Sequence, residues 1–398
     1  MKHRIVVLGA GYAGTYTAGN LARRLSREDI EITVVNAVPD FVERMRLHQL
    51  ATGRDLGSRR LADIFAGTGI QLRVARVTGI DPGRRTVALR GEDGDSDLPY
   101  DTLLHTLGSS VADHGVPGVT DHAFDVAGRP SALRLRERLA ALGAGGTVLI
   151  VGEGLTGIET ATEVAESRPD LAVALAARGE LGDRLSPKAR AHLRRAFDRL
   201  GIAVHEHTAV EAVEPNRAVA ADGTSIPAEV TVWTAGFAAH PLAADAGLEV
   251  TGTGRIVVDG TMRSVSHPDI YVAGDSAYAI GENGLPLPMS CASAGFTGKQ
   301  AIAAIVARLT GSHVPSTGLK YHGNHISLGR RDAIVQLVDG DARPKSWYLG
   351  GRPAARIKSG VLRGAAWSIG HPTFGKPLRR HRVNTAGPDR AGVTATTA

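Results

Sequence analysis

Two glycine-rich segments of this sequence have the spacing that binds the pyrophosphate of a dinucleotide. They are Gly9-Ala10-Gly11-Tyr12-Ala13-Gly14 and, about 143 residues later, Gly152-Glu153-Gly154-Leu155-Thr156-Gly157. In such a motif the first glycine makes a tight turn, the second lets the backbone approach the phosphates, and the third allows a helix to pack closely on a strand. The phosphates then meet the free N–H groups of a helix N-terminus. Two copies in one chain predict two bound dinucleotides.

The residue that ends the second strand of each unit normally contacts the ribose, and neither of these residues is acidic here. Asn36 ends the first unit, and its amide can hydrogen-bond a ribose hydroxyl, so we expect it to bind there. Arg178 follows the corresponding strand of the second unit. An acid would accept from the 2′-hydroxyl of NADH, whereas an arginine pairs with the 2′-phosphate of NADPH. Arg178 therefore favours NADPH, unless its side chain points into solvent.

The elements that position these motifs alternate between short apolar runs and helical stretches, which predicts a doubly wound α/β fold. Residues 1–36 form strand, turn, helix and strand, and residues 146–177 repeat the unit. Further strands are expected at 71–77, 86–90, 102–107, 202–208, 218–220, 230–234 and within 321–350, with a polar connection at 91–99. Helices are expected at 293–309 and 354–369. The second helix is amphipathic, with an apolar side made of Ile357, Val361, Leu362, Ala365, Ala366 and Ile369.

Composition excludes several classes of protein. A single cysteine, Cys291, cannot form an internal disulfide or the paired redox cysteines of dithiol flavoproteins. We expect no secretory leader, because Met1-Lys2-His3-Arg4 runs directly into an apolar strand, and no membrane span, so a cytoplasmic location is the simplest. No metal site is predicted.

The positive charge is concentrated at the C-terminal end. From Arg343 onward the chain has eleven Lys and Arg residues against one acid, Asp389, although its total formal charge is only +6. Such a region is attracted to anionic membrane surfaces or nucleic acid. The alternative is a solvated, partly disordered end.

Together with later segments, these motifs resemble the two-dinucleotide-binding-domain flavoproteins of the pyridine nucleotide-disulfide oxidoreductase superfamily, and within them the type II NADH dehydrogenases. The likeness covers residues 1–370 or so. The segments that carry it are Thr106-Leu107-Gly108 and Trp233-Thr234-Ala235-Gly236 (the crossovers between domains), Tyr271-Val272-Ala273-Gly274-Asp275 (the late FAD motif) and Tyr321–Arg331. The resemblance implies that FAD and NAD(P)H are the cofactors and that Asp275 hydrogen-bonds the ribityl chain of FAD.

The resemblance also implies a domain organisation. We expect two Rossmann-like, three-layer domains, one for FAD and one for NAD(P), with the second inserted in the first, and a small C-terminal α+β domain. The predicted boundaries are 1–110 and 237–320 for the FAD domain, 111–236 for the NAD(P) domain and 321–383 for the C-terminal domain with its amphipathic helix. Residues 384–398 are predicted to be a disordered tail.

The sequence departs from the family near the flavin. Ala292, Phe296 and Thr297 fall where type II dehydrogenases have the glutamines that meet quinone, and these residues leave room for a bulkier acceptor. Residues 41–48 lack the cysteine of sulfide:quinone reductases and cysteine peroxidases, so neither chemistry is expected. Cys291 has no flanking His or Lys that would lower its pKa, and we expect a packing residue there.

Two side chains are candidates for catalysis. His48 near the flavin would donate a proton to the reduced acceptor, since the ordinary pKa of histidine is near neutral. The alternative is a structural or surface histidine. The resemblance places Glu159 on the nicotinamide side of the flavin, and the alternative is a surface ion pair on its helix.

The sequence thus predicts an NAD(P)H oxidoreductase that passes electrons through FAD to a quinone, a quinonoid small molecule or another protein. One alternative is an FAD-dependent dehydrogenase of a specialised metabolite. A more distant one is a redox-responsive binding protein resembling apoptosis-inducing factor. The basic C-terminal region suggests peripheral attachment to the inner face of a membrane, nucleic acid is not the expected partner, and a homodimer is an open prediction.

Overall fold

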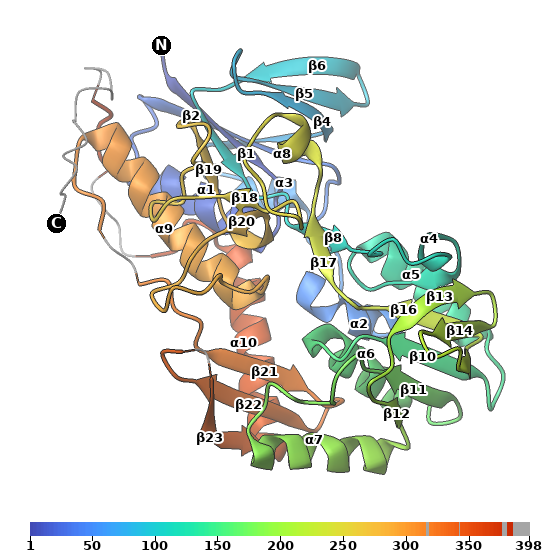
Figure 1. The fold of residues 1–398 in the computed structure, drawn as a ribbon. Helices are drawn as coiled ribbons and strands as arrows, with labels where there is room; N and C mark the ends of the chain where they lie inside the picture. Colours follow the sequence, from blue (N-terminus) through green and yellow to red (C-terminus); the bar gives the residue numbers. More distant parts are fainter. Residues whose placement is uncertain (316–317, 342, 376–379, 385–398) are drawn as a thin grey trace.

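The computed structural model describes residues 1–315, 318–341, 343–375 and 380–384. The predicted disordered tail therefore lies outside the described residues, apart from Asn384. Two parallel five-stranded sheets and a C-terminal antiparallel sheet form the framework (Figure 1). This arrangement confirms the predicted Rossmann-like α/β fold.

The first parallel sheet holds the first glycine-rich turn. Its strand order is β19-β7-β1-β2-β3. The strands are β1 (His3–Leu8), β2 (Ile30–Asn36), β3 (Ile70–Val74), β7 (Thr102–His105) and β19 (Ile270–Val272). Strands β7 and β19 and most of β1 and β2 are buried, whereas three of the five residues of the edge strand β3 are exposed. The two long helices of this part, α1 (Tyr12–Arg24) and α9 (Cys291–Thr310), pack against one another.

The second parallel sheet repeats the plan around the second turn, with the order β12-β11-β10-β16-β9. Its strands are β9 (Ala123–Phe124), β10 (Thr147–Val151), β11 (Ala172–Ala176), β12 (Ala203–His205) and β16 (Val230–Trp233). Its main helices are α5 (Arg129–Ala141), α6 (Leu155–Ser167) and α7 (Pro187–Leu200). The first sheet takes strands from 1–110 and 237–320, and the second from 111–236. The exact domain boundaries remain a prediction.

Smaller strands fill the connections, and one of them corrects the sequence analysis. They are β4 (Arg76–Asp81), β5 (Thr86–Gly91), β6 (Gly94–Pro99), β8 (Ser109–Val111), β13 (Val210–Glu214), β14 (Arg217–Ala220), β15 (Ser225–Pro227), β17 (Phe237–Ala239), β18 (Ile256–Val257) and β20 (Ala277–Tyr278). The polar connection predicted at 91–99 is mostly strand β6, antiparallel to β5. Its polar residues are compatible with a strand because one face of an antiparallel sheet can meet water. The single strand predicted at 71–77 is two strands, which divide at Ala75.

Short helical segments complete these two parts of the chain. They are η1 (Arg44–Arg46), α2 (Leu47–Ala51), α3 (Leu61–Phe65), α4 (Val119–His122), α8 (Leu242–Asp245) and η2 (Gly274–Ser276).

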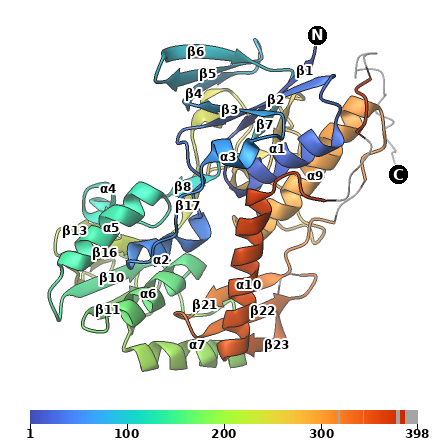
Figure 2. The ribbon, with the colours of Figure 1, turned by 180° about the vertical axis from the view of Figure 1, so that it is seen from behind.

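The C-terminal part consists of the antiparallel strands β21 (Gly323–Ser327), β22 (Ala333–Val338) and β23 (Pro344–Gly350) and the helix α10 (Gly351–Gly370). Figure 2 shows α10 running from this sheet to α1. Its buried side is Ala354, Ala355, Leu362, Ala366 and Ile369, whereas Ile357 and Val361 are 45% and 47% exposed. The apolar side predicted for this helix was therefore wrong at Ile357 and Val361. No helix in the described part of the chain is long and apolar enough to cross a membrane.

Candidate active site

A cavity of about 2250 Å³ is lined by residues of both parallel units and of the C-terminal part. It lies beyond the carboxyl ends of β1, β7, β10 and β16, where Gly9, Thr106, Gly152 and Thr234 contribute to its wall. This is where open α/β sheets bind their ligands. All the candidate site residues line this cavity except Gly14 and Gly157. Residues that are far apart in the sequence are thus brought to one space.

The first glycine-rich turn has the shape that a dinucleotide requires. Gly9 has a φ of +94°, and a Cβ there would lie 2.6 Å from the Thr106 carbonyl oxygen. A Cβ on Gly14 would lie 1.8 Å from the Gly9 carbonyl oxygen, so this glycine serves packing. A Cβ on Gly11 would meet no atom within 4 Å. Gly11 thus leaves open space for a pyrophosphate at the start of α1, and the residues fit FAD.

Asn36 lies beside this turn at the end of β2. Its side-chain oxygen accepts a hydrogen bond from the Ala10 N–H at 2.9 Å, and its amide nitrogen donates to the Val38 carbonyl at 2.8 Å. These bonds hold the strand end against the glycine turn. The Asn36 side chain retains one N–H and one lone pair that could hydrogen-bond a ribose hydroxyl. Binding of the ribose by Asn36 therefore stays a prediction.

Asp275 is half-buried and held by a relay that sequence reasoning missed. The Ser109 hydroxyl donates to Asp275 at 2.7 Å, and the Arg44 guanidinium donates to the Ser109 hydroxyl at 2.9 Å. Gly274 and Gly108, with φ of +77° and +73°, lie in the same wall. The N-terminus of α9, capped by Ser290, faces the cavity beside them.

The second turn repeats the geometry of the first. A Cβ on Gly152 would lie 2.9 Å from the Ala235 backbone, and one on Gly157 would lie 1.9 Å from the Gly152 carbonyl oxygen. Gly154, like Gly11, has nothing within 4 Å of its missing Cβ. Gly236 also lines the cavity, where a Cβ would meet the ring of His114. The residues therefore fit a second dinucleotide.

Arg178 is exposed and lines the cavity two residues after the end of β11. Its backbone N–H donates to the Glu153 carboxylate at 3.2 Å. No hydrogen bond or ion pair of its guanidinium occurs among the described residues. The Arg178 side chain therefore lies near the second glycine-rich turn but forms no hydrogen bond or ion pair with it among the described residues.

A buried ion pair lies at the α6 side of the cavity. The Lys358 ammonium on α10 contacts the Glu159 carboxylate on α6 at 2.9 Å and donates to the His325 carbonyl at 2.8 Å. The Ser327 N–H donates to the same carboxylate at 2.9 Å. Burial alone would raise the pKa of Glu159, but the Lys358 ammonium and the Ser327 N–H lower it below its ordinary value. Glu159 is therefore a carboxylate and not part of a surface pair.

Lys358 was not predicted, although its position carried a signal. It lies four residues after Ala354 and four before Leu362, within the buried stripe of α10. A single cation inside an apolar stripe indicates a buried partner, because an unpaired charge is costly to bury. The apolar side predicted for this helix named only apolar residues and so left Lys358 out.

His48 is 4% exposed and lines the cavity near the ion pair. Its Nε2 has no hydrogen-bond partner among the described residues. Burial lowers its pKa, although Glu159 and Glu163 act in the opposite direction. His48 is thus a neutral histidine and not a surface one, and its predicted proton transfer remains a prediction.

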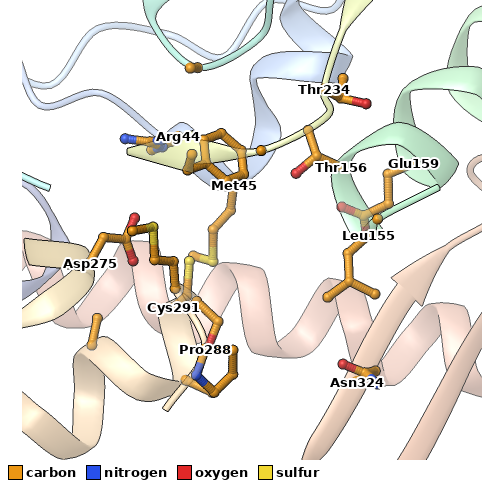
Figure 3. A pocket seen from close by; sticks show the side chains of 18 of the residues that line it. Arg44, Met45, Leu155, Thr156, Glu159, Thr234, Asp275, Pro288, Cys291 and Asn324 are labelled. Atoms are coloured by element: carbon orange, nitrogen blue, oxygen red, sulfur yellow. The ribbon is translucent and has the colours of Figure 1, made fainter. Parts of the chain in front are cut away.

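The segment that replaces the family's glutamines forms the opposite wall. Figure 3 shows Asp275 and Cys291 on one side of the cavity and Leu155, Thr156 and Glu159 on the other. Ala292 is exposed, whereas the Thr297 hydroxyl is buried and accepts from the Gly274 N–H at 3.0 Å. Cys291 is exposed, so the expectation of a packing residue was wrong. Although this side chain is open to the cavity, the surrounding wall partly desolvates the thiol, and this desolvation together with the charge of Asp275 raises its pKa to about 11, so it is not a thiolate.

Comparison with known proteins gives concordant results. Residues 3–298 match the profile of the family described as pyridine nucleotide-disulphide oxidoreductase. The NADH dehydrogenase-like protein Rv1812c of Mycobacterium tuberculosis is 29% identical over 359 residues, which are 83% of this chain and 87% of that protein. The type II NADH:quinone oxidoreductase NdhA of the same organism is 24% identical over 381 residues, which are 84% and 79% of the two chains.

A similar fold occurs in the structure of NDH2 from Plasmodium falciparum in complex with NADH. The TM-score is 0.78 at 14% identity, and the match covers 94% of this chain and 97% of that one. At such low identity the likeness concerns the fold alone.

Proposed function

This chain belongs to the pyridine nucleotide-disulphide oxidoreductase family, and we propose that it oxidises NAD(P)H and reduces a quinone-type small molecule beside the Glu159–Lys358 pair. This proposal gives Glu159 a role at the acceptor in place of the nicotinamide-side role expected from the resemblance. It is an oxidoreductase whose cofactors are FAD and NAD(P)H. When bound, FAD takes two electrons from the nicotinamide and passes them to the acceptor. The observation that carries the proposal is that one cavity holds two dinucleotide-binding turns and a buried ion pair.

The buried pair supplies what a quinone needs beyond electrons. Reduction of a quinone to a hydroquinone consumes two electrons and two protons, whereas NAD(P)H delivers a hydride, equivalent to two electrons and one proton. The second proton must come from the protein or from water. Two N–H groups of Lys358 are used by Glu159 and His325. The third has no partner among the described residues, so it can donate to an acceptor oxygen.

A quinone-type acceptor is also supported by the relatives and by the cavity wall. One relative is named an NADH:quinone oxidoreductase. On the opposite wall, the small side chain of the exposed Ala292 narrows the cavity less than a glutamine would. Chemistry through paired cysteines is excluded, since Cys291 is the single cysteine of the sequence.

Helix α10 supports attachment to an anionic membrane surface. Its exposed face combines Ile357, Val361 and Trp367 with Arg352, Arg356 and Arg363. Such a helix lies in the interface with its apolar side chains among the lipids. Val361 also lines the cavity, so the attached face would adjoin the acceptor site.

The test separates the two halves of the reaction. The full-length, FAD-loaded protein is mixed anaerobically with NADH or NADPH while flavin absorbance is followed, and the reduced protein is then mixed with menadione. Rapid bleaching followed by rapid reoxidation is expected. A flavin that neither nicotinamide bleaches would refute the proposal and favour the metabolite dehydrogenase.

Lys358→Met should slow reoxidation by roughly 10²-fold, as loss of a positioned proton donor does, and leave bleaching unchanged. Lys358→Met leaves the Glu159 carboxylate buried without its partner, which can destabilise the protein. The double variant Lys358→Met/Glu159→Gln removes that charge as well and is therefore measured in parallel. Lys320→Met is the matched control, since Lys320 lines the same cavity and pairs with Glu282 at 2.8 Å. Equal reoxidation rates in all these proteins would exclude the role of Lys358.

A further inference from the structure

The two glycine-rich turns are linked to their neighbouring strands in opposite ways. In the first unit the strand-end residue reaches the turn, because the Asn36 side chain accepts from the N–H of Ala10, the second residue of the motif. In the second unit the second residue of the motif, Glu153, reaches the strand end. Its carboxylate accepts from the Arg178 N–H at 3.2 Å.

The hydrogen bond from Arg178 to Glu153 holds a carboxylate beside the end of β11, where the strand itself has no acidic residue. Strands β10 and β11 are parallel, with Val151 beside Ala176, so the turn and the strand end are adjacent. Ala176 and Ala177 are buried, and neither can bind a ribose through its side chain. The other Glu153 carboxylate oxygen faces Gly179. A Cβ added at Gly179 would lie 3.9 Å from this oxygen, and because glycine has no side chain the oxygen is left uncovered there. Glu153 is half-buried and lines the cavity.

We propose that Glu153 binds the adenosine-ribose hydroxyls of the nicotinamide donor and makes NADH, not NADPH, the preferred donor. One carboxylate oxygen is anchored by the Arg178 N–H, and the other is available to accept from a hydroxyl. A 2′-phosphate at the same place would be repelled by the carboxylate. The Arg178 guanidinium has no hydrogen bond or ion pair among the described residues, and we expect the anchored carboxylate to outweigh its attraction for a 2′-phosphate. The inference rests on the proposed function, which makes a nicotinamide the electron donor. It is opposite to the preference for NADPH that Arg178 alone predicts.

A binding measurement tests the role of Glu153 without catalysis. ADP-ribose and 2′-phospho-ADP-ribose are titrated into the full-length, FAD-loaded protein by calorimetry. The wild type should bind ADP-ribose at least about tenfold more tightly, the size expected of a hydrogen bond to a charged group. Glu153→Gln, which removes only the charge, should lose most of this discrimination. Glu211→Gln, which removes an exposed carboxylate of β13 outside the cavity lining, is the matched control and should retain it.

Either of two results overturns the inference: tighter binding of the 2′-phosphorylated ligand by the wild type, or unchanged discrimination in Glu153→Gln with a wild-type melting temperature. The ratio of flavin bleaching rates with NADH and NADPH provides the second readout. If ADP-ribose is preferred but neither nicotinamide bleaches the flavin, the proposed function fails and the role of Glu153 stands. If both bleach the flavin and Glu153→Gln leaves their ratio unchanged, the inference fails and the function stands.

Discussion

At the scale of single residues, the glycines of each turn have two separable roles. Gly14 and Gly157 lie against the carbonyl oxygens of Gly9 and Gly152, so a side chain there would collide with backbone. Gly11 and Gly154 lie against open space at the cavity wall. One glycine of each pair thus permits the fold, and the other permits the ligand.

Alanine substitutions should separate these roles. Gly157→Ala places a methyl group 1.9 Å from the Gly152 carbonyl oxygen, and we expect the free energy of unfolding to fall by about 1–3 kcal/mol or more. Gly154→Ala should leave that free energy nearly unchanged but weaken NAD(P)H binding about tenfold, because the methyl group keeps the pyrophosphate from the backbone. Chemical denaturation and nicotinamide titration measure the two effects. Similar losses of stability in both variants would contradict this division.

At the scale of elements, α10 performs three tasks with two sides of one helix. Ala354, Leu362 and Ala366 pack into the protein. Lys358, on the same stripe, reaches Glu159 in the cavity. Ile357 and Trp367 remain exposed beside arginines. The helix thereby links the proposed acceptor site to the proposed membrane-facing surface.

Replacing an exposed apolar residue of α10 should weaken membrane attachment without affecting the fold. Ile357→Glu should reduce cosedimentation with phosphatidylserine-containing vesicles by about tenfold in affinity, since the side chain can no longer be buried among lipids. Trp347→Glu on β23, where Trp347 is 58% exposed, serves as control. Equal binding of wild type and Ile357→Glu would argue against α10 as the attached surface.

At the scale of the whole molecule, the site depends on three sheets held in one arrangement. The C-terminal sheet is joined to the second unit by buried contacts, among them Ser327 with Glu159 and Gln336 with the Ser186 hydroxyl at 2.7 Å. The first sheet supplies the other wall through Gly9 and Asp275. Any condition that loosens this arrangement therefore acts on the site as well as on stability.

Acid is such a condition, because the first sheet buries a histidine at the end of β7. His105 is 1% exposed, neither ring nitrogen has a partner among the described residues, and burial lowers its pKa to about 4. The unfolded chain takes up this proton near pH 6.5, so stability should decline progressively from pH 6.5 to pH 4. His105 alone accounts for about 3 kcal/mol over that range. His105→Leu should flatten the decline measured by denaturation against pH, whereas His313→Leu, at an exposed position, should not.

Several features could be predicted from the sequence because their causes are local. The two glycine turns and their flanking parallel strands each follow from steric and burial requirements that span a few neighbouring residues, whereas the role of Asp275 came from the resemblance. The resemblance then supplied the cofactors. Strand β6 escaped prediction because a solvent-facing antiparallel strand need not be apolar.

Other features depended on tertiary structure, because they join residues that are remote in the sequence. The pairing of Glu159 with Lys358 and the relay from Arg44 through Ser109 to Asp275 arise only when separate elements pack together. The exposure of Ile357 and Cys291 was decided in the same way, by which neighbours cover each face. The sequence by itself determined that two dinucleotides bind through two like units. Only the packing of those units and the C-terminal helix determined which charged side chains meet in the cavity, since periodicity along one element does not specify its partners.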